Sequence, residues 1–169
     1  ARGAGRVALV AGPPGIGKTR LLDEVAAAAG PMRVARGASP ETGAAPPLWP
    51  IVEALRDLGP NSLPELGTGL DDEILAPLRS AVLGTSTPVI ARPTGPDDGA
   101  AFRIDDAVAD LLIRIARRAP LLLVLDDLHT VDAATARVLG RIADRVEDEP
   151  LAVLGTHRDT PGDHTPAFT

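Results

Sequence analysis

The stretch from Gly12 to Thr19, read GPPGIGKT, limits what this chain can fold into more than any other stretch. It matches the phosphate-binding pattern GxxxxGK(S/T) at every fixed position. The short apolar run Val7–Ala11 precedes it and predicts a buried parallel strand, while Arg20–Ala29 follows with a helical pattern. A strand, a glycine-rich loop and a helix in this order favour a phosphate-binding loop over a chance run of glycines.

The chemistry of such a loop assigns roles to its residues. Phosphate oxygens need several N–H donors directed at one point, and a loop around the first turn of a helix supplies them with the positive end of the helix dipole. Proline has no N–H, so we expect the donors to follow Pro14. Lys18 can reach the β- and γ-phosphates, and the Thr19 hydroxyl can join the shell of a Mg²⁺ ion. The candidate nucleotide-binding residues are Gly12, Gly15, Ile16, Gly17, Lys18, Thr19 and Arg20.

A second diagnostic stretch is the wholly apolar run Leu121–Leu125, which ends in Asp126 and Asp127. This pattern is typical of a strand buried on both faces of a parallel sheet, and ligands bind outside the carboxyl ends of such strands. We expect Asp126 to hold Mg²⁺ and Asp127 to orient or deprotonate the attacking water. The alternative is that the two acids merely end a strand and cap the segment after it.

A further strand is expected at Leu151–Leu154, and Arg158 follows it near the same sheet edge as Asp126. A cation at this place can sense a γ-phosphate, which makes Arg158 a candidate catalytic residue together with Asp127. The alternative is a surface arginine paired with Asp159 or with Asp163.

The rest of the chain predicts alternating strands and helices. Strands are expected at Arg6–Ala11 and Met32–Ala35, helices at Pro50–Leu58, Asp71–Leu83, Ala100–Arg118 and Ala133–Val146 with Asp132 as N-cap, and a flexible loop at Thr85–Gly99. The expected apolar faces comprise Leu21, Leu22 and Val25 on the first helix and Phe102, Ala107, Val108, Leu111, Leu112 and Ile115 on the helix 100–118.

Composition narrows the class of protein. The 169 residues suit one domain, and the net charge of −6 argues against binding of nucleic acid by this segment. The absence of cysteine excludes a disulfide framework, and the apolar runs are too short to span a bilayer. The histidines His129, His157 and His164 are too scattered for a metal cluster, and we assign them no chemistry. We expect a cytoplasmic location and a chain that is a fragment of a longer protein.

Four segments together resemble a known family. GPPGIGKTRLLDEV, FRIDDAVADLL, PLLLVLDDLHTVDAAT and LAVLGTHRD resemble the ATPase module of AAA-like, STAND-type P-loop ATPases, which include large bacterial LuxR-type transcriptional regulators. The resemblance runs from about Arg6 to Asp159. It implies an α/β three-layer sandwich with a mostly parallel sheet, in which the sensor strand separates the Walker A and Walker B strands.

The resemblance also implies ligands and partners. It implies ATP or ADP with Mg²⁺, with Lys18 and Thr19 as nucleotide and Mg²⁺ contacts, Asp126 as the Walker B acid and Arg158 as the first sensor. It implies a larger protein with a helical-repeat sensor region and often a DNA-binding domain. The expected partners are therefore the nucleotide, other domains of the same chain and, as a further class, a second copy; we expect no nucleic acid and no membrane.

The chain departs from the family pattern at several points. Thr130 and Val131 follow His129 where the family usually carries a Trp, and His157 precedes Arg158 where the family usually has Tyr. The acidic segment before the first strand, and the lid and fifth strand after the last one, are not in this sequence. These parts normally hold adenine, so the sequence does not predict how the base is recognised.

Three functions remain open from sequence. The first is a nucleotide switch that binds ATP and hydrolyses it slowly, as a module of a signal-transducing regulator. The second is a small-molecule kinase with the same loop, which a phosphate-acceptor pocket lined by arginine would favour. The third is a nucleotide-binding scaffold that never turns over.

Overall fold

The computed structural model describes residues 4–39, 45–59, 72–85 and 98–159. Its elements follow one another as β1 Arg6–Gly12, α1 Lys18–Ala27, β2 Arg33–Ala38, α2 Trp49–Asp57, α3 Asp72–Val82, α4 Asp98–Arg118, β3 Leu121–Asp126, α5 Ala133–Ala143 and β4 Leu151–Arg158, with short 3₁₀ turns η2 at Leu128–Thr130 and η3 at Val146–Asp148. None of the described helices is long and apolar enough to cross a membrane. Every element expected in this part of the chain is present, with ends shifted by a few residues.

The sheet has four strands, all parallel, in the order β1-β4-β3-β2. The expected separation of β1 and β3 by β4 is therefore confirmed, as is the α/β fold class. The register sets Gly12 beside Arg158 and Ala38 beside Asp126. Because all strands run in one direction, their carboxyl ends meet at one edge, where polar side chains from distant segments come together.

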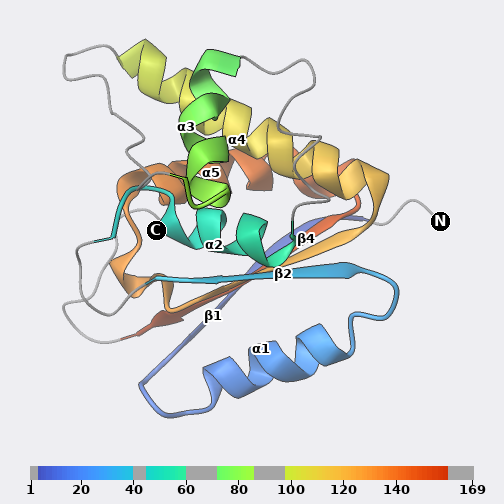
Figure 1. The fold of residues 1–169 in the computed structure, drawn as a ribbon. Helices are drawn as coiled ribbons and strands as arrows, with labels where there is room; N and C mark the ends of the chain where they lie inside the picture. The colour runs from blue at the N-terminus through green and yellow to red at the C-terminus, as the bar shows by residue number, and fades with distance from the viewer. Residues whose placement is uncertain (1–3, 40–44, 60–71, 86–97, 160–169) are drawn as a thin grey trace.

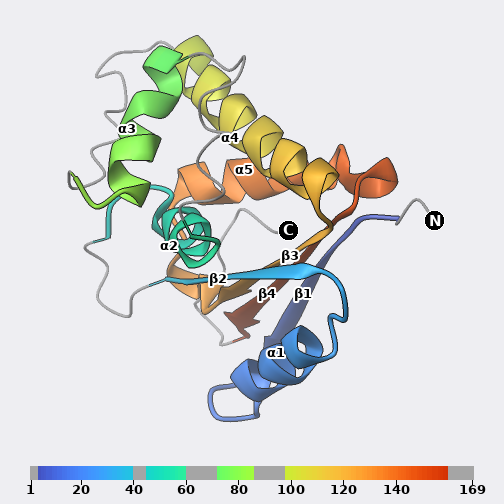
Figure 2. The same cartoon turned by 45° about the vertical axis from the view of Figure 1, so that its right-hand side comes forward.

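The helices cover both faces of this sheet (Figures 1 and 2). Helix α1 lies on one face, and α2, α4 and α5 lie on the other. On β3, Leu122 and Val124 pack with Leu22 of α1, whereas Leu121 and Leu123 belong to the larger core on the opposite side. Burying a leucine side chain fully contributes about 1.5–3 kcal/mol, so the apolar β3 anchors both layers.

Two of the predicted apolar faces need correction. On α1, Leu21 is 46% exposed and Val25 36% exposed, whereas Leu22 is buried. The buried face of α1 is narrower than predicted, because the helix packs on the sheet through Leu22 and the small Ala26. On α4, Phe102 is 53% exposed.

The boundaries of two further segments also differ from the prediction. The loop expected at Thr85–Gly99 is shorter at its end, since Asp98 and Gly99 already belong to α4, and residues 86–97 lie outside the described part of the chain. Helix α5 ends at Ala143 rather than Val146, and Val146 instead begins the turn η3. The expected N-cap is confirmed, since the Asp132 carboxylate accepts hydrogen bonds from the Ala134 and Thr135 N–H groups.

A row of ion pairs joins α4 to α5 and to Arg145, which follows α5. Asp105 pairs with Arg137, and Arg145 pairs with both Asp106 and Asp110. The carboxylate-bearing Asp105 is only 1% exposed, so loss of its arginine would leave a buried charge unpaired, which is costly. The two outer pairs are more exposed and contribute little, about 0–1 kcal/mol each.

Helix α2 closes the side of β2 that faces away from β3. The Arg36 N–H donates to Asp57 Oδ2 at 2.9 Å and the Ala38 N–H donates to Glu53 Oε2 at 3.1 Å. These two acids are four positions apart on α2, so they face the same strand. Their carboxylates satisfy backbone donors that would otherwise offer an open strand edge.

This close approach predicts that Gly37 cannot be replaced. A Cβ at Gly37 would lie 1.9 Å from the carbonyl oxygen of Pro50, so Gly37→Ala must push α2 away from β2. We expect a loss of at least about 1–3 kcal/mol in the free energy of unfolding, measured by urea denaturation with Trp49, the single tryptophan, as the fluorescent reporter.

The matched control is Gly140→Ala on the exposed side of α5. A Cβ there meets nothing within 4 Å, and alanine favours a helix, so we expect a gain of about 0.4–1 kcal/mol. Equal stabilities for Gly37→Ala and the wild type would contradict the packing of α2 on β2.

Candidate functional site

The loop between β1 and α1 has the backbone that anion binding requires. Gly15 and Gly17 have φ angles of 77° and 100°, a region that favours glycine. Gly17 is the N-cap of α1 and makes no side-chain capping bond, so the first turn of the helix begins without a side-chain acceptor for its N–H groups. These donors, with the positive end of the helix dipole, fit a phosphate group.

Lys18 lies across the mouth of this loop. Its Nζ donates to the carbonyl oxygens of Gly12 at 2.8 Å and Pro13 at 3.0 Å. An ammonium has three N–H donors, so one remains for an anion. Lys18 is the only lysine of the sequence, so no other ammonium side chain of this chain could take its place.

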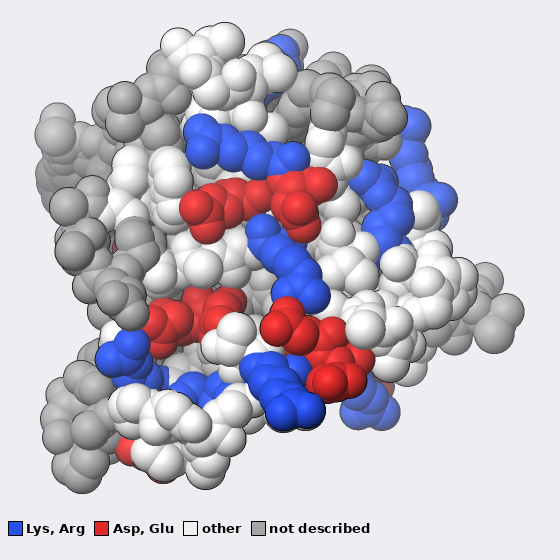
Figure 3. Space-filling view, turned by 60° about the horizontal axis from the view of Figure 1, so that its bottom comes forward, with Lys and Arg blue, Asp and Glu red and all other residues white. Residues whose placement is uncertain are grey.

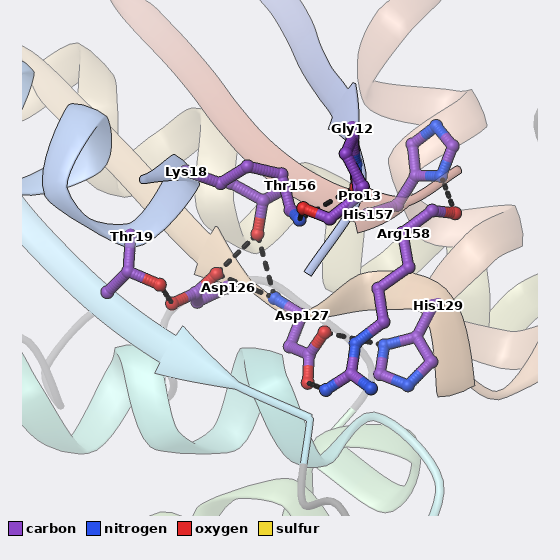
Figure 4. A network of polar contacts seen from close by, with 10 residues as sticks. All are labelled: Gly12, Pro13, Lys18, Thr19, Asp126, Asp127, His129, Thr156, His157 and Arg158. Carbon is purple, nitrogen blue, oxygen red and sulfur yellow. Dashed lines mark hydrogen bonds and ion pairs between the residues drawn. The ribbon is translucent and has the colours of Figure 1, made fainter. Parts of the chain in front are cut away.

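Asp126 joins three segments of the chain (Figure 4). The Thr19 hydroxyl of α1 donates to Asp126 Oδ2 at 2.8 Å, and the Thr156 hydroxyl of β4 donates to Oδ1. Mg²⁺ prefers oxygen ligands and takes only one or two carboxylates from a protein. The adjacent hydroxyl and carboxylate of Thr19 and Asp126 fit that requirement, so these two residues would hold the ion.

Asp127 is held both by its backbone and by its side chain. Its φ and ψ angles of 59° and 47° lie in the left-handed region, and its N–H donates to Asp126 Oδ1 at 2.9 Å and Thr156 Oγ1 at 3.0 Å. Its Oδ2 accepts a hydrogen bond from Arg158 Nη2 at 3.2 Å, and its Oδ1 lies 2.6 Å from His129 Nδ1 (Figure 4). Non-glycine residues in this backbone region are uncommon and occur often at functional sites.

These groups face one cavity of about 390 Å³. Its lining comprises Pro14, Gly15, Gly17, Lys18, Thr19, Asp126, Asp127 and Arg158. The structure thus brings together most of the predicted site residues from α1, β3 and β4. Gly12 contributes a carbonyl that holds Lys18, while the exposed side chains of Ile16 and Arg20 are not in the lining; their expected contribution through backbone N–H groups stays a prediction.

Arg158 has a different partner from the one that the surface-arginine alternative proposed. It pairs with Asp127 in the cavity, and Asp163 lies outside the described residues. The register explains its position, because Arg158 lies beside Gly12 at the start of the loop.

Sequence reasoning missed two polar residues of this network, Thr156 and His129. Thr156 is fully buried and stands two positions before Arg158, so the two-residue period of a strand could have placed both at the same site. His129 has no such periodic signal, because its position depends on the turn that follows β3.

Comparison with known proteins identifies the family. A family model described as an AAA ATPase domain matches residues 1–154, which include the loop Gly12–Thr19 and both acids but not Arg158. Comparison with curated proteins gave no significant match. Since the family match covers most of the chain, and the fold and the arrangement of loop, lysine and acids agree with it, this chain belongs to the AAA ATPase domain family.

Proposed function

We propose that this chain is the nucleotide switch of a signal-transducing regulator, which binds ATP with Mg²⁺ and hydrolyses it slowly to ADP and phosphate. The observation that carries the proposal is one cavity in which Lys18, Thr19 and Asp126 lie beside a second carboxylate, Asp127, that is paired with Arg158. A site that only bound a phosphate would not need the second acid and its arginine.

Binding follows from the loop and the lysine. The N–H groups after Pro14 and the Lys18 ammonium would contact the phosphates, and Thr19 with Asp126 would hold Mg²⁺. The ion, when bound, neutralises charge on the β- and γ-phosphates. The chain's own part is to fix these groups at one sheet edge and to keep the carboxylate oriented by two hydroxyls.

Hydrolysis assigns roles to Asp127 and Arg158. A water oxygen forms a bond to the γ-phosphorus, the bond from that phosphorus to the bridging oxygen of ADP breaks, and the water proton passes to the Asp127 carboxylate. Arg158 would face the charge that develops on the γ-phosphate. It is the only arginine in the lining of this cavity within the described residues, and an additional arginine finger is worth about 10³–10⁵ in rate, so slow turnover is expected.

The regulator role rests on the motifs that resemble STAND-type and LuxR-type proteins. In such a protein, other domains of the same chain or a second copy would supply the groups that accelerate hydrolysis, such as an additional arginine finger. This segment is not expected to bind DNA, because its net charge is −6 and acidic and basic side chains are interspersed over the described part of the face in Figure 3. We propose a cytoplasmic location for the regulator, where ATP is available.

A second cavity supports an alternative, a small-molecule kinase. This cavity of about 250 Å³ adjoins Thr19 and Asp126 and is lined in addition by Arg36 and Glu53. It therefore meets part of the requirement for an acceptor pocket. Arg36, however, pairs with Asp23 at 2.7 Å and Glu53 accepts from the Ala38 N–H, so neither side chain is directed at an acceptor alone.

The first prediction concerns binding. Lys18→Ala should weaken ATP·Mg²⁺ affinity by about 10–100-fold, because a charge-assisted contact contributes about 1.5–3 kcal/mol. Calorimetry measures this. The matched control is Arg20→Ala, which removes the same charge two residues away on α1 but leaves the backbone N–H in place and should bind ATP normally. Equal ATP affinity of Lys18→Ala and wild type would contradict the proposed contact of Lys18 with the phosphates.

The two acids should separate by role. Asp126→Asn should lose the Mg²⁺ dependence of ATP binding, because a ligand charge is removed. Asp127→Asn should bind ATP·Mg²⁺ but lose hydrolysis by about 10²–10⁴-fold in single-turnover assays with radiolabelled ATP, because only water activation is lost. Identical behaviour of the two variants would show that the assignment is wrong.

Turnover should depend on assembly. We expect the dilute chain to hydrolyse ATP far below the roughly 1–100 s⁻¹ typical of kinases. Steady-state phosphate release over a series of protein concentrations, with sedimentation at each, measures whether the rate per chain rises on association. Fast turnover independent of concentration would reject the switch. Transfer of the labelled phosphate to an added small alcohol or amine, rather than to water, would favour the kinase.

A further inference from the structure

His129 lies against the second acid of the site. Its Nδ1 is 2.6 Å from Asp127 Oδ1, and the two side chains are only 12% and 23% exposed. A carboxylate can only accept a hydrogen bond, so the contact is attractive when Nδ1 carries the hydrogen. The structure gives an ion-pair approach of the two groups that is not aligned as a hydrogen bond.

The ring is fixed by the turn η2. Asp127 in the left-handed region reverses the chain at the end of β3, and Leu128 then enters the core, where it is fully buried. Space for Leu128 exists because β4 has glycine opposite it: a Cβ at Gly155 would lie 2.7 Å from Leu128 Cδ1. An anchored residue on the turn therefore holds His129 next to Asp127.

The two oxygens of Asp127 have partners of different kinds. Oδ2 accepts from Arg158, which lines the cavity, whereas Oδ1 contacts His129, which does not line it. If Arg158 turned its Nη2 group toward a γ-phosphate, that group would move away from Asp127 Oδ2, although the guanidinium has other N–H donors. His129 has no such competing role in the lining, so it can hold the carboxylate while Arg158 moves.

We propose that His129 is a positioning residue for Asp127. It fixes Oδ1 through Nδ1–H and leaves Oδ2 directed at the cavity, where that oxygen accepts the proton of the attacking water. This inference rests on the proposed hydrolytic function. It predicts that His129 affects the rate of hydrolysis and not the affinity for ATP.

The test compares three substitutions of His129. Asparagine places an amide N–H near the position of Nδ1, glutamine places it farther out near Nε2, and leucine has no donor. Single-turnover hydrolysis with protein in excess over radiolabelled ATP should slow by about 10–100-fold in His129→Leu and His129→Gln, a part of the roughly 10²–10⁴-fold contribution of a general base. His129→Asn should recover most of the rate.

Further measurements separate positioning from folding. All three variants should bind ATP·Mg²⁺ with wild-type affinity in calorimetry, and urea denaturation shows which are folded; if leucine unfolds the chain, the asparagine and glutamine pair carries the comparison. In an Asp127→Asn background, His129→Gln should cause no further loss of rate, because its effect acts through that carboxylate.

The outcomes distinguish the inference from the function. A wild-type chain that binds ATP but never hydrolyses it would overturn both the hydrolytic function and this inference. A wild-type chain that hydrolyses ATP while His129→Gln is equally fast would overturn only the role of His129. Loss of ATP affinity in all variants, or an asparagine variant as slow as glutamine, would also reject positioning by an Nδ1 donor.

Discussion

The carboxylate of Asp126 is the interaction on which the rest of the site depends. It ends β3, and its two oxygens accept hydrogen bonds from Thr19 on α1 and Thr156 on β4. The Asp126 carboxylate therefore connects three segments that are far apart in sequence. Its Oδ1 also accepts a hydrogen bond from the Asp127 N–H. Removing the carboxylate would leave these donors without their acceptor, so the phosphate loop and the second acid would lose their fixed relation to each other.

Charge balance explains why the site would need a metal ion. The side chains that line the cavity carry two positive charges, Lys18 and Arg158, and two negative charges, Asp126 and Asp127. Their sum is zero, so side chains alone cannot neutralise a polyphosphate. The remaining attraction would have to come from the N-terminal end of α1 and from Mg²⁺, which Thr19 and Asp126 would hold. Arg137 and Arg145 do not help, because they are paired with Asp105, Asp106 and Asp110 of α4.

Sequence reasoning predicted the parts of the structure that follow from periodicity. Alternating burial and the apolar run Leu121–Leu125 predict β3, and the meeting of strand ends predicts that Asp126 and Arg158 lie at one edge; the order of strands came from the family resemblance. Periodicity cannot give the geometry of turns. The backbone of Asp127 has a positive φ angle, and the turn that follows it places His129 next to the Asp127 carboxylate. The exposure of Phe102 was missed for another reason: its ring lies against Arg141, whose guanidinium carbon is 3.7 Å from the ring centroid, and not in the core.

Under the proposed function, Arg158 would link nucleotide binding to the availability of the Asp127 carboxylate as a base. In the structure this side chain is bound to Asp127, while its position beside Gly12 in the register puts it within the cavity that phosphates would enter. Under the proposed function, a guanidinium that moved toward a bound anion would lengthen its contact with Oδ2 of Asp127 and leave that oxygen open to the attacking water. Such a coupling needs a second contact that keeps the released carboxylate in place, and on the described part of the chain that contact is the histidine on the turn after β3. Under the proposed switch function, this pairing would hold back hydrolysis until Arg158 moves, and the chain would bind ATP for long periods before hydrolysis.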